Sequence, residues 1–254
     1  MAEFKNGKLQ LPDVTLVAVT SVKIKATIKA MKYSMERVDF KDAVLVTHRK
    51  PLGLPSNIRF GKIEKLDNID KFNYDMVYEL YKYVNTSHIM LVHYDGFVVN
   101  PESWRDEFLD YDYIGAPWPI PPSDDKITFR DPDGKLIRVG NSVGIRSKKL
   151  LEAPSKLNIP WQSFYGWYNE DGFLCCHHHK ELEEYGLKFA PIEVARYLSQ
   201  EQQMPETLGI VPFAFHKWEG PNAKYPKFDN PTVFERVYKK MRHIMHVLLR
   251  RENK

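Results

Sequence analysis

The chain has little cysteine: its 254 residues include two, Cys175 and Cys176, which are neighbours. A disulfide framework is therefore excluded, and a reducing compartment is compatible with the sequence. Long apolar runs are also missing, so no segment is long enough to span a bilayer, and residues 1–10 lack the apolar centre of a secretory signal. We found no internal repeat and no low-complexity segment. These absences predict a cytoplasmic protein.

The excess of positive charge is small, with a formal net charge of +4. The basic residues are scattered through most of the chain instead of forming one stripe, so nucleic acid is not an expected partner. The hydrophobic content of 43% is enough for a sizeable core. We expect one domain over residues 1–222 and a C-terminal appendage over residues 223–254.

Strands alternate with helices in the first hundred residues. Apolar, β-branched runs predict strands at 14–20, 43–47 and 88–94, and amphipathic patterns predict helices at 24–38 and 73–84. This order is typical of βαβ units, so the predicted fold class is α/β, with a mainly parallel central sheet flanked by helices.

The pattern loosens after residue 104. The Pro-rich segment 115–122 cannot be helical, and we expect the middle of the chain to form loops and short strands that build a pocket. Helices are expected at 147–151 and 171–185, and a strand at 188–195.

From Pro231 the chain predicts a final amphipathic helix, with apolar residues on one face and basic residues elsewhere. Two interpretations are open. The favoured one is packing against the domain or a second subunit, and the other is peripheral contact with an anionic membrane.

The strand at 88–94 ends in Asp95, which Gly96 follows. Such a pair is common in turns, since both residues tolerate the backbone angles that a turn needs. In an open α/β sheet, however, a residue at the carboxyl end of a strand faces the crevice where ligands collect. Asp95 is therefore a candidate for contact with a ligand.

Four further segments follow Asp95 in a fixed order. They are the run Tyr-Asp-Tyr-Ile-Gly-Ala-Pro-Trp at 111–118, a Gly- and Asn-containing stretch from 139 to Arg-Ser at 146–147, the pair Glu170-Asp171, and Phe-Ala-Phe-His at 213–216. With them the chain resembles the GT-A-type glycosyltransferases over about residues 14–218, and more narrowly a bacterial and viral family of proposed glycosyltransferases. The eight-residue run is the most specific element.

The resemblance implies a GT-A-like, Rossmann-like fold that moves a sugar from a UDP, GDP or dTDP donor to a glycan, a lipid-linked glycan or another hydroxyl acceptor. Mn²⁺ or Mg²⁺ is the implied cofactor. Asp95 and His216 would hold the ion against the diphosphate, with Lys217 assisting. The usual Asp-x-Asp reads His-Tyr-Asp here, so His93 is either a third ligand, a hydrogen-bond donor to phosphate, or neither.

On the donor side, the strand end formed by Val19, Thr20 and Ser21 would meet the base or ribose. Tyr94, Asn141 and Lys217 are further candidates for donor binding. His48 and Arg49 either line the same cleft or belong to a solvated loop.

On the opposite side of the sugar, Asp171 is the favoured general base, with Glu170 binding acceptor or sugar hydroxyls. A general base implies inversion at the sugar carbon. The alternative for both carboxylates is the capping of a helix N-terminus.

Two features of the chain keep other functions open. The missing carboxylate at His93 is compatible with a non-catalytic glycan- or nucleotide-binding protein on the same fold, and the run Cys175 to His179 with a zinc hydrolase, although four ligands cannot converge from consecutive helical residues. Also, the stretch 140–146 is poor in glycine for the family, which would reshape the acceptor pocket.

Four aromatic residues either stack on sugars or belong to the core: Trp118, Trp161, Phe164 and Trp167.

Overall fold

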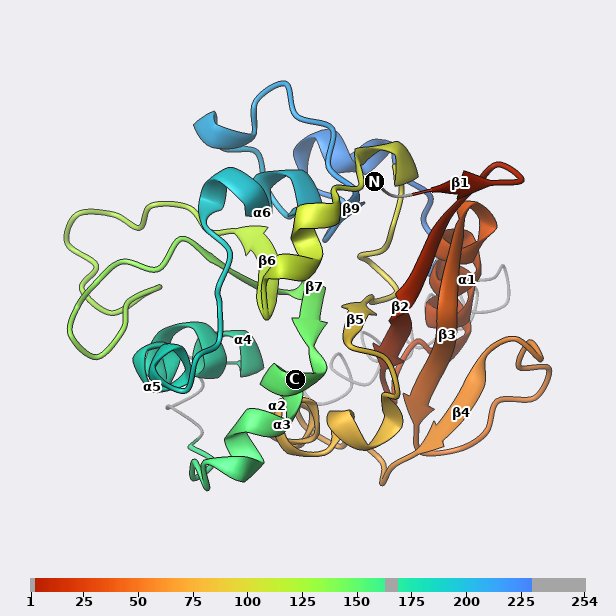
Figure 1. The fold of residues 1–254 in the computed structure, drawn as a ribbon, viewed down its shortest axis with the longest axis horizontal. Helices are drawn as coiled ribbons and strands as arrows, with labels where there is room; N and C mark the ends of the chain where they lie inside the picture. The colour runs from red at the N-terminus through yellow and green to blue at the C-terminus, as the bar shows by residue number, and fades with distance from the viewer. Residues whose placement is uncertain (1–2, 163–168, 230–254) are drawn as a thin grey trace, which may run out of the picture.

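The computed structural model describes residues 3–162 and 169–229 (Figure 1). The strands are β1 (Phe4–Lys5), β2 (Lys8–Val19), β3 (Val38–Thr47), β4 (Arg59–Lys62), β5 (His88–Leu91), β6 (Tyr113–Pro117), β7 (Val139–Ser147), β8 (Ser199–Gln200) and β9 (Ala214–Phe215). The α-helices are α1 (Ile24–Arg37), α2 (Ile69–Tyr78), α3 (Lys148–Lys156), α4 (Glu170–Gly172), α5 (His179–Glu184) and α6 (Ile192–Leu198). A π-helical turn covers Phe173–His177, and short 3-10 helices cover Leu80–Tyr83, Pro101–Ser103, Asp106–Asp110, Pro205–Thr207 and Gly220–Lys224.

The central sheet has the order β4-β3-β2-β5-β7-β6, and β1 pairs with the start of β2. Strands β4, β3, β2 and β5 are parallel, whereas β7 runs antiparallel to both of its neighbours. Helix α1 packs on β2 and β3, and α2 packs on α3 below the sheet edge in Figure 1. The predicted α/β class, with a mostly parallel central sheet and flanking helices, is confirmed.

The central strands are apolar because both of their faces are covered. The segment 14–19 of β2 is buried without interruption, and so is 43–47 of β3. Helix α1 buries Ala26, Ala30 and Met31 on one side and leaves most of its lysines exposed. An amphipathic helix over a continuous apolar sheet therefore forms this part of the core.

Several predicted elements differ from the observed ones. The helix expected at 73–84 begins four residues earlier at Ile69, because the side chain of Asn68 accepts a hydrogen bond from the amide of Lys71 at 2.8 Å. The helix expected at 171–185 is divided into α4, the π-helical turn and α5. The strand expected at 188–195 is wrong: within that range only Phe189 forms an isolated bridge, and α6 begins at Ile192 after Pro191.

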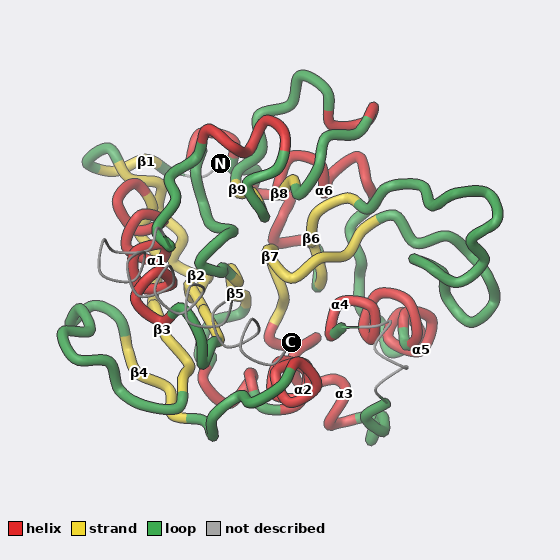
Figure 2. Tube along the Cα trace, turned by 180° about the vertical axis from the view of Figure 1, so that it is seen from behind, coloured by secondary structure: helices red, strands yellow, loops and turns green. Residues whose placement is uncertain are grey.

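Strand β7 was not expected as an element, and it packs against β6 through glycine. A Cβ on Gly115 would lie 1.5 Å from the carbonyl oxygen of Gly140, and one on Gly144 would lie 2.0 Å from that of Ile114. The phenol of Tyr113 donates to the carbonyl of Asn141 at 2.7 Å. The 111–118 run thus forms the edge strand β6, and its glycine is required for contact with β7. The β6–β7 connection at 118–138 extends to one side of the molecule as loop (Figures 1 and 2).

In the described part of the chain, no helix has both the length and the apolar character needed to cross a membrane. The predicted C-terminal helix lies outside the described residues. The first residues of the expected appendage pack on the domain, since the ring of Tyr225 lies 4.7 Å from that of Phe215 and the ring of Phe228 lies 5.2 Å from that of Phe97. The division into 1–222 and 223–254 stays a prediction.

Candidate functional site

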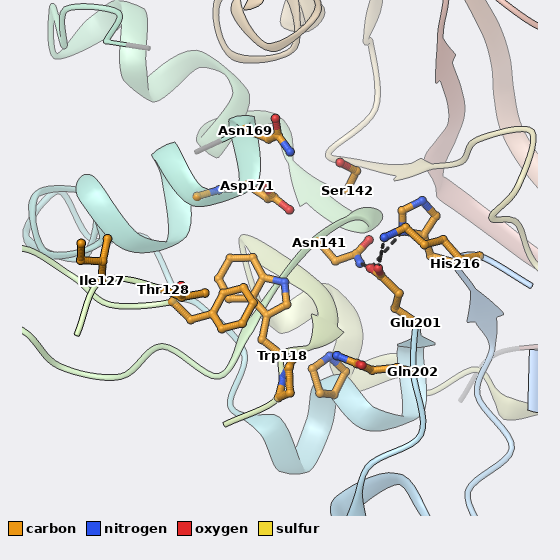
Figure 3. A pocket seen from close by; sticks show the side chains of 15 residues that line it. Trp118, Ile127, Thr128, Asn141, Ser142, Asn169, Asp171, Glu201, Gln202 and His216 are labelled. Carbon is orange, nitrogen blue, oxygen red and sulfur yellow. Dashed lines mark hydrogen bonds and ion pairs between the residues drawn. The ribbon is translucent and has the colours of Figure 1, made fainter. Parts of the chain in front are cut away.

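Two pockets lie at one edge of the sheet, and His216 lines both of them. The first, which we call the β2 pocket, has a volume of about 390 Å³ and lies at the carboxyl ends of β2 and β5. The second, the β7 pocket, has a volume of about 360 Å³ and lies where β6 ends and β7 begins (Figure 3). Since β7 runs antiparallel, its start lies at the same edge as the ends of the parallel strands.

Asp95 is held in the β2 pocket by a tight turn. The amide of His93 donates to the carbonyl of Gly96 at 2.7 Å, and the amide of Lys217 donates to the carbonyl of Asp95 at 2.7 Å. A Cβ on Gly96 would lie 2.6 Å from Cγ2 of Val143 and 2.9 Å from Cδ2 of His216. The turn and the crevice interpretations of this segment therefore describe one structure, in which the turn places the Asp95 side chain in the pocket.

The imidazole of His216 lies between two carboxylates. Its Nε2 is 3.9 Å from Oδ1 of Asp95, and its Nδ1 is 3.2 Å from Oε2 of Glu201. The ring of His93 is 5.7 Å away, centre to centre. Burial, with help from the neighbouring His216 and Arg146, lowers the pKa of His93 to about 3, so that ring is neutral at physiological pH.

The described residues include no group of three or more His, Cys, Asp or Glu side chains spaced to hold a metal ion. Of the three expected ligands, the structure brings together Asp95 and His216 as a pair of oxygen and nitrogen donors on one side of the β2 pocket. This donor set fits a Mg²⁺- or Mn²⁺-type ion only if ligand phosphates and water complete the shell. His93 lines the pocket without joining such a set.

Glu201, which the sequence analysis missed, connects the pair to the β7 pocket. Its carboxylate accepts hydrogen bonds from His216, from Nδ2 of Asn141 and from Nζ of Lys217. Burial alone would raise the pKa of Glu201, but the hydrogen bonds from His216 and Lys217 outweigh it and lower that pKa. Glu201 therefore stays ionised and holds His216 by Nδ1.

The signal that could have revealed Glu201 is the pairing of β8 with β9. Residue Gln200 pairs with Phe215, so Glu201 and His216 directly follow the ends of two neighbouring parallel strands. Nothing in the local sequence around Glu201 indicates this pairing.

The pair Glu170-Asp171 separates into a buried and a pocket-lining carboxylate. Glu170 is 1% exposed and forms an ion pair at 3.1 Å with Arg146, which is equally buried, and Ser142 donates to it as well. Asp171 lines the β7 pocket, where burial and the charge of Glu170 raise its pKa to about 7. The side chain of Glu170 is thus engaged in structure, and that of Asp171 can exchange a proton near neutral pH.

The expected donor-binding residues divide among three pockets. Val19, Thr20, Ser21 and Tyr94 line the β2 pocket. Asn141 and Lys217 line the β7 pocket. His48 and Arg49 line neither of these, and instead line a third pocket that shares Ser21 with the first.

Aromatic side chains border the β7 pocket. Trp118 lines it and stacks on Phe129, with ring centres 4.6 Å apart. Trp161 packs edge-on against the partly buried Tyr78. Phe164 and Trp167 lie outside the described residues. Trp118 thus remains a candidate for sugar stacking.

The two cysteines are free and buried. They belong to a hydrophobic cluster that also contains Tyr113, Phe173 and Leu182. They therefore act as apolar core residues.

These observations define an α/β protein in which two pockets that share His216 lie at the carboxyl edge of the parallel strands. Comparison with family models matches residues 57–216 to the family described as a protein of unknown function, DUF5672, and the chain belongs to that family. No curated protein matches the chain.

Two solved structures are similar to this chain at low identity. One is the galactosyltransferase LgtC in complex with donor and acceptor sugar analogs, with 13% identity and a TM-score of 0.47 over 82% of this chain and 87% of that one. The other is an active-site mutant of LgtC, with 12% identity and a TM-score of 0.44 over 82% of this chain and 88% of that one. At these values the likeness carries no function over to this chain.

Proposed function

We propose that the chain is a glycosyltransferase that moves a sugar from a nucleotide-sugar donor to a hydroxyl of a glycan or lipid-linked glycan, with inversion. The observation that carries the proposal is the meeting of two pockets at His216, one with Asp95 and the other with Asp171. A transfer between two substrates needs two neighbouring sites, with a charge-stabilising group on one side and a proton acceptor on the other.

In this scheme the donor occupies the β2 pocket, with its base or ribose at the end of β2 and its diphosphate near Asp95 and His216. The acceptor occupies the β7 pocket beside Trp118. A divalent ion held by Asp95, His216 and the diphosphate would offset the charge that develops on the leaving group. Lys217 lines the β7 pocket, where its Nζ donates to Glu201, and it would add a positive charge on the other side of His216.

The chemical step balances with Asp171 as the base. The acceptor oxygen forms a bond to the anomeric carbon while the bond from that carbon to the diphosphate oxygen breaks, and the electron pair leaves with the diphosphate. The acceptor proton goes to the carboxylate of Asp171. With a pKa of about 7, this group is a stronger base than an ordinary aspartate and is still ionised in a useful fraction at neutral pH.

The first experiment is a thermal-shift screen against UDP, GDP and dTDP sugars with Mn²⁺, Mg²⁺ or EDTA, because a ligand that binds the folded state raises its stability by mass action. We expect a metal-dependent shift with one nucleotide class.

Nucleotide release and the anomeric configuration of the product are then measured. Asp171→Asn should lower turnover by about 10²-fold or more, with donor binding kept. Asp39→Asn, at an exposed position on β3, is the matched control and should leave both unchanged.

Unchanged turnover in Asp171→Asn would refute the role of Asp171 as the base, and a retained anomeric configuration would refute the inverting mechanism.

A second candidate function, a non-catalytic glycan- or nucleotide-binding protein, is favoured by the lack of a three-residue metal cluster among the described residues. Donor binding without any hydrolysis or transfer would support it. The cytoplasmic location and the peripheral membrane contact through residues 223–254 stay predictions.

A further inference from the structure

A third pocket, which we call the basic pocket, lies between the start of α1 and the end of β3. Its volume is about 750 Å³. The proposed transfer uses neither this pocket nor the two residues, His48 and Arg49, that the sequence analysis had assigned to the donor. The side chains that line this pocket therefore need a separate explanation.

The charged side chains that line the basic pocket are mainly cationic. Five of them are Lys23, Lys25, Lys29, Arg49 and Lys65, and Asp229 is the one acidic residue of the lining. Asp229 is bound to Lys23 at 2.8 Å, and Lys65 pairs with Asp67 at 3.0 Å. Within the described part of the chain, Lys25, Lys29 and Arg49 form no ion pair, so at least three positive charges face one hollow without compensation.

The placement of these charges on α1 is the reverse of what the helix itself favours. The N-terminus of a helix carries a partial positive charge and is stabilised by acidic side chains. The first turn of α1 has no acidic residue, and no side chain caps it. Lys25 and Lys29 are also four residues apart on one face, where like charges repel. An anion in the pocket would relieve both effects, since it could accept from the uncapped amides and from the lysines.

The basic pocket also adjoins the β2 pocket. Ser21 lines both, and its hydroxyl is fixed by a hydrogen bond with Nδ1 of His48 at 3.1 Å and by one from the amide of Leu66 at 2.9 Å. The ammonium of Lys23 lies 5.0 Å from the ring centre of Tyr94, a residue of the β2 pocket. A ligand in the basic pocket would thus lie next to whatever occupies the end of β2.

We propose that the basic pocket is an anion site that binds a phosphate-bearing small molecule. A tetrahedral, multiply charged oxyanion suits several lysines, an arginine and the uncapped amides of a helix N-terminus. These cations line a hollow and not a flat face, which favours a small molecule over a membrane surface. The inference does not rest on the proposed transferase activity, because the site needs no metal ion and no reaction.

The test is calorimetric titration of the full chain with inorganic pyrophosphate in low-salt buffer containing EDTA. The variant Lys25→Ala/Arg49→Ala removes two charges from different elements of the pocket. The matched control Lys32→Ala/Lys41→Ala removes two exposed lysines outside the lining of the pocket, one on α1 and one on β3. We expect the pocket variant to bind at least about tenfold more weakly and the control to stay within roughly twofold of the wild type. Circular dichroism checks that both variants are folded.

Several results would overturn the proposal. One is the absence of pyrophosphate binding to the wild type, and another is equal binding by the pocket variant and the control. Loss of binding in His216→Gln with full binding in the pocket variant would place the anion at Asp95 and His216 instead. Binding to phosphatidylcholine vesicles only when they contain phosphatidylserine, with no binding of pyrophosphate, would replace the small molecule with a lipid surface.

Discussion

Asp171 and Glu170 are adjacent in the chain, yet their carboxylates have different surroundings. Glu170 is enclosed with Arg146, whereas Asp171 faces the β7 pocket and has a pKa raised by burial and by the charge of Glu170. The surroundings of Asp171 thus include the carboxylate of Glu170, whose charge is part of what raises the pKa of Asp171.

The first prediction at this scale concerns stability against pH. A carboxyl group whose pKa is higher in the folded than in the unfolded state stabilises the fold at a pH below the ordinary aspartate pKa of about 4, and this contribution is lost as pH rises from there through about 7. Asp171→Asn removes the penalty of ionising the buried group. We expect the variant to be more stable than the wild type at pH 8, by about 1–3 kcal/mol, with a smaller gain at pH 5. Denaturant unfolding at the two pH values measures the difference in the free energy of unfolding between the variant and the wild type. An equal difference at both pH values would contradict the prediction.

The second residue-scale prediction is that Gly96 cannot carry a side chain. A Cβ there would lie 2.8 Å from the carbonyl oxygen of Phe215, besides its close approach to Val143 and His216. Gly96→Ala should cost about 1–3 kcal/mol of folding free energy and displace the His216 ring. In Gly53→Ala, no atom lies within 4 Å of the new Cβ, so that change should cost about 1 kcal/mol, from its positive φ alone. Urea unfolding of both variants makes the comparison, and equal costs would refute the steric argument.

At the scale of elements, the strands that the sequence predicted are those with continuous apolar and β-branched residues. β7 was missed because 139–147 contains Gly140, Asn141 and Gly144, which have low strand propensity. It is a strand because β5 and β6 pair with it on either side and because glycine lets β6 approach closely. Strand β7 thus forms through contacts with segments far away in the chain, and such contacts leave no local pattern in the sequence.

The π-helical turn after Glu170-Asp171-Gly172 is a second feature that periodicity could not indicate. It places Phe173, Leu174, Cys175 and Cys176 together in the interior. Because consecutive helical residues point in different directions, burial of all four shows that this turn is enclosed by the surrounding core on most of its sides. The predicted single helix at 171–185 was therefore correct in type over most of its length and wrong in its continuity.

The prediction at this scale concerns the ion pair that joins β7 to α4. Removing one partner of a buried pair leaves the other charge buried and alone, so Glu170→Gln should cost about 3–5 kcal/mol of folding free energy. Glu152→Gln breaks an exposed pair with Lys156 on α3 at 2.7 Å and should cost less than about 1 kcal/mol. Guanidinium unfolding of the two variants tests the difference. A cost below that of the exposed pair would show that Arg146 finds another partner.

For the whole molecule, the extent of the folded domain can be tested at its C-terminal side. Tyr225 and Phe228 pack on the rings of Phe215 and Phe97, beyond the boundary at 222 that composition suggested. In the full chain, Phe228→Ala should lower the free energy of unfolding by about 1–3 kcal/mol. Phe4→Ala, at a side chain that is 46% exposed, should change it by less than about 0.5 kcal/mol. Equal, small effects would support the boundary at 222.

The sequence predicted the fold class and fewer than half of the residues that line the two pockets, mainly those at strand ends and in polar pairs, because these are local signals. It could not tell which pocket each residue joins, nor find Glu201, because both depend on the pairing of segments far apart in the chain. Asn141 and Glu201, for example, are sixty residues apart and form one hydrogen bond. The basic pocket depends on such a pairing too, since β3 and α1 bring Arg49 and Lys25 to the same hollow.

Because His216 lines both the β2 and the β7 pocket, the two cannot bind independently once a ligand moves that ring. Thermodynamic linkage then makes the coupling reciprocal: the factor by which one ligand changes the affinity of the second equals the factor by which the second changes that of the first. An inhibitor of either pocket would therefore be competitive toward one substrate and would alter the affinity for the other by a fixed factor.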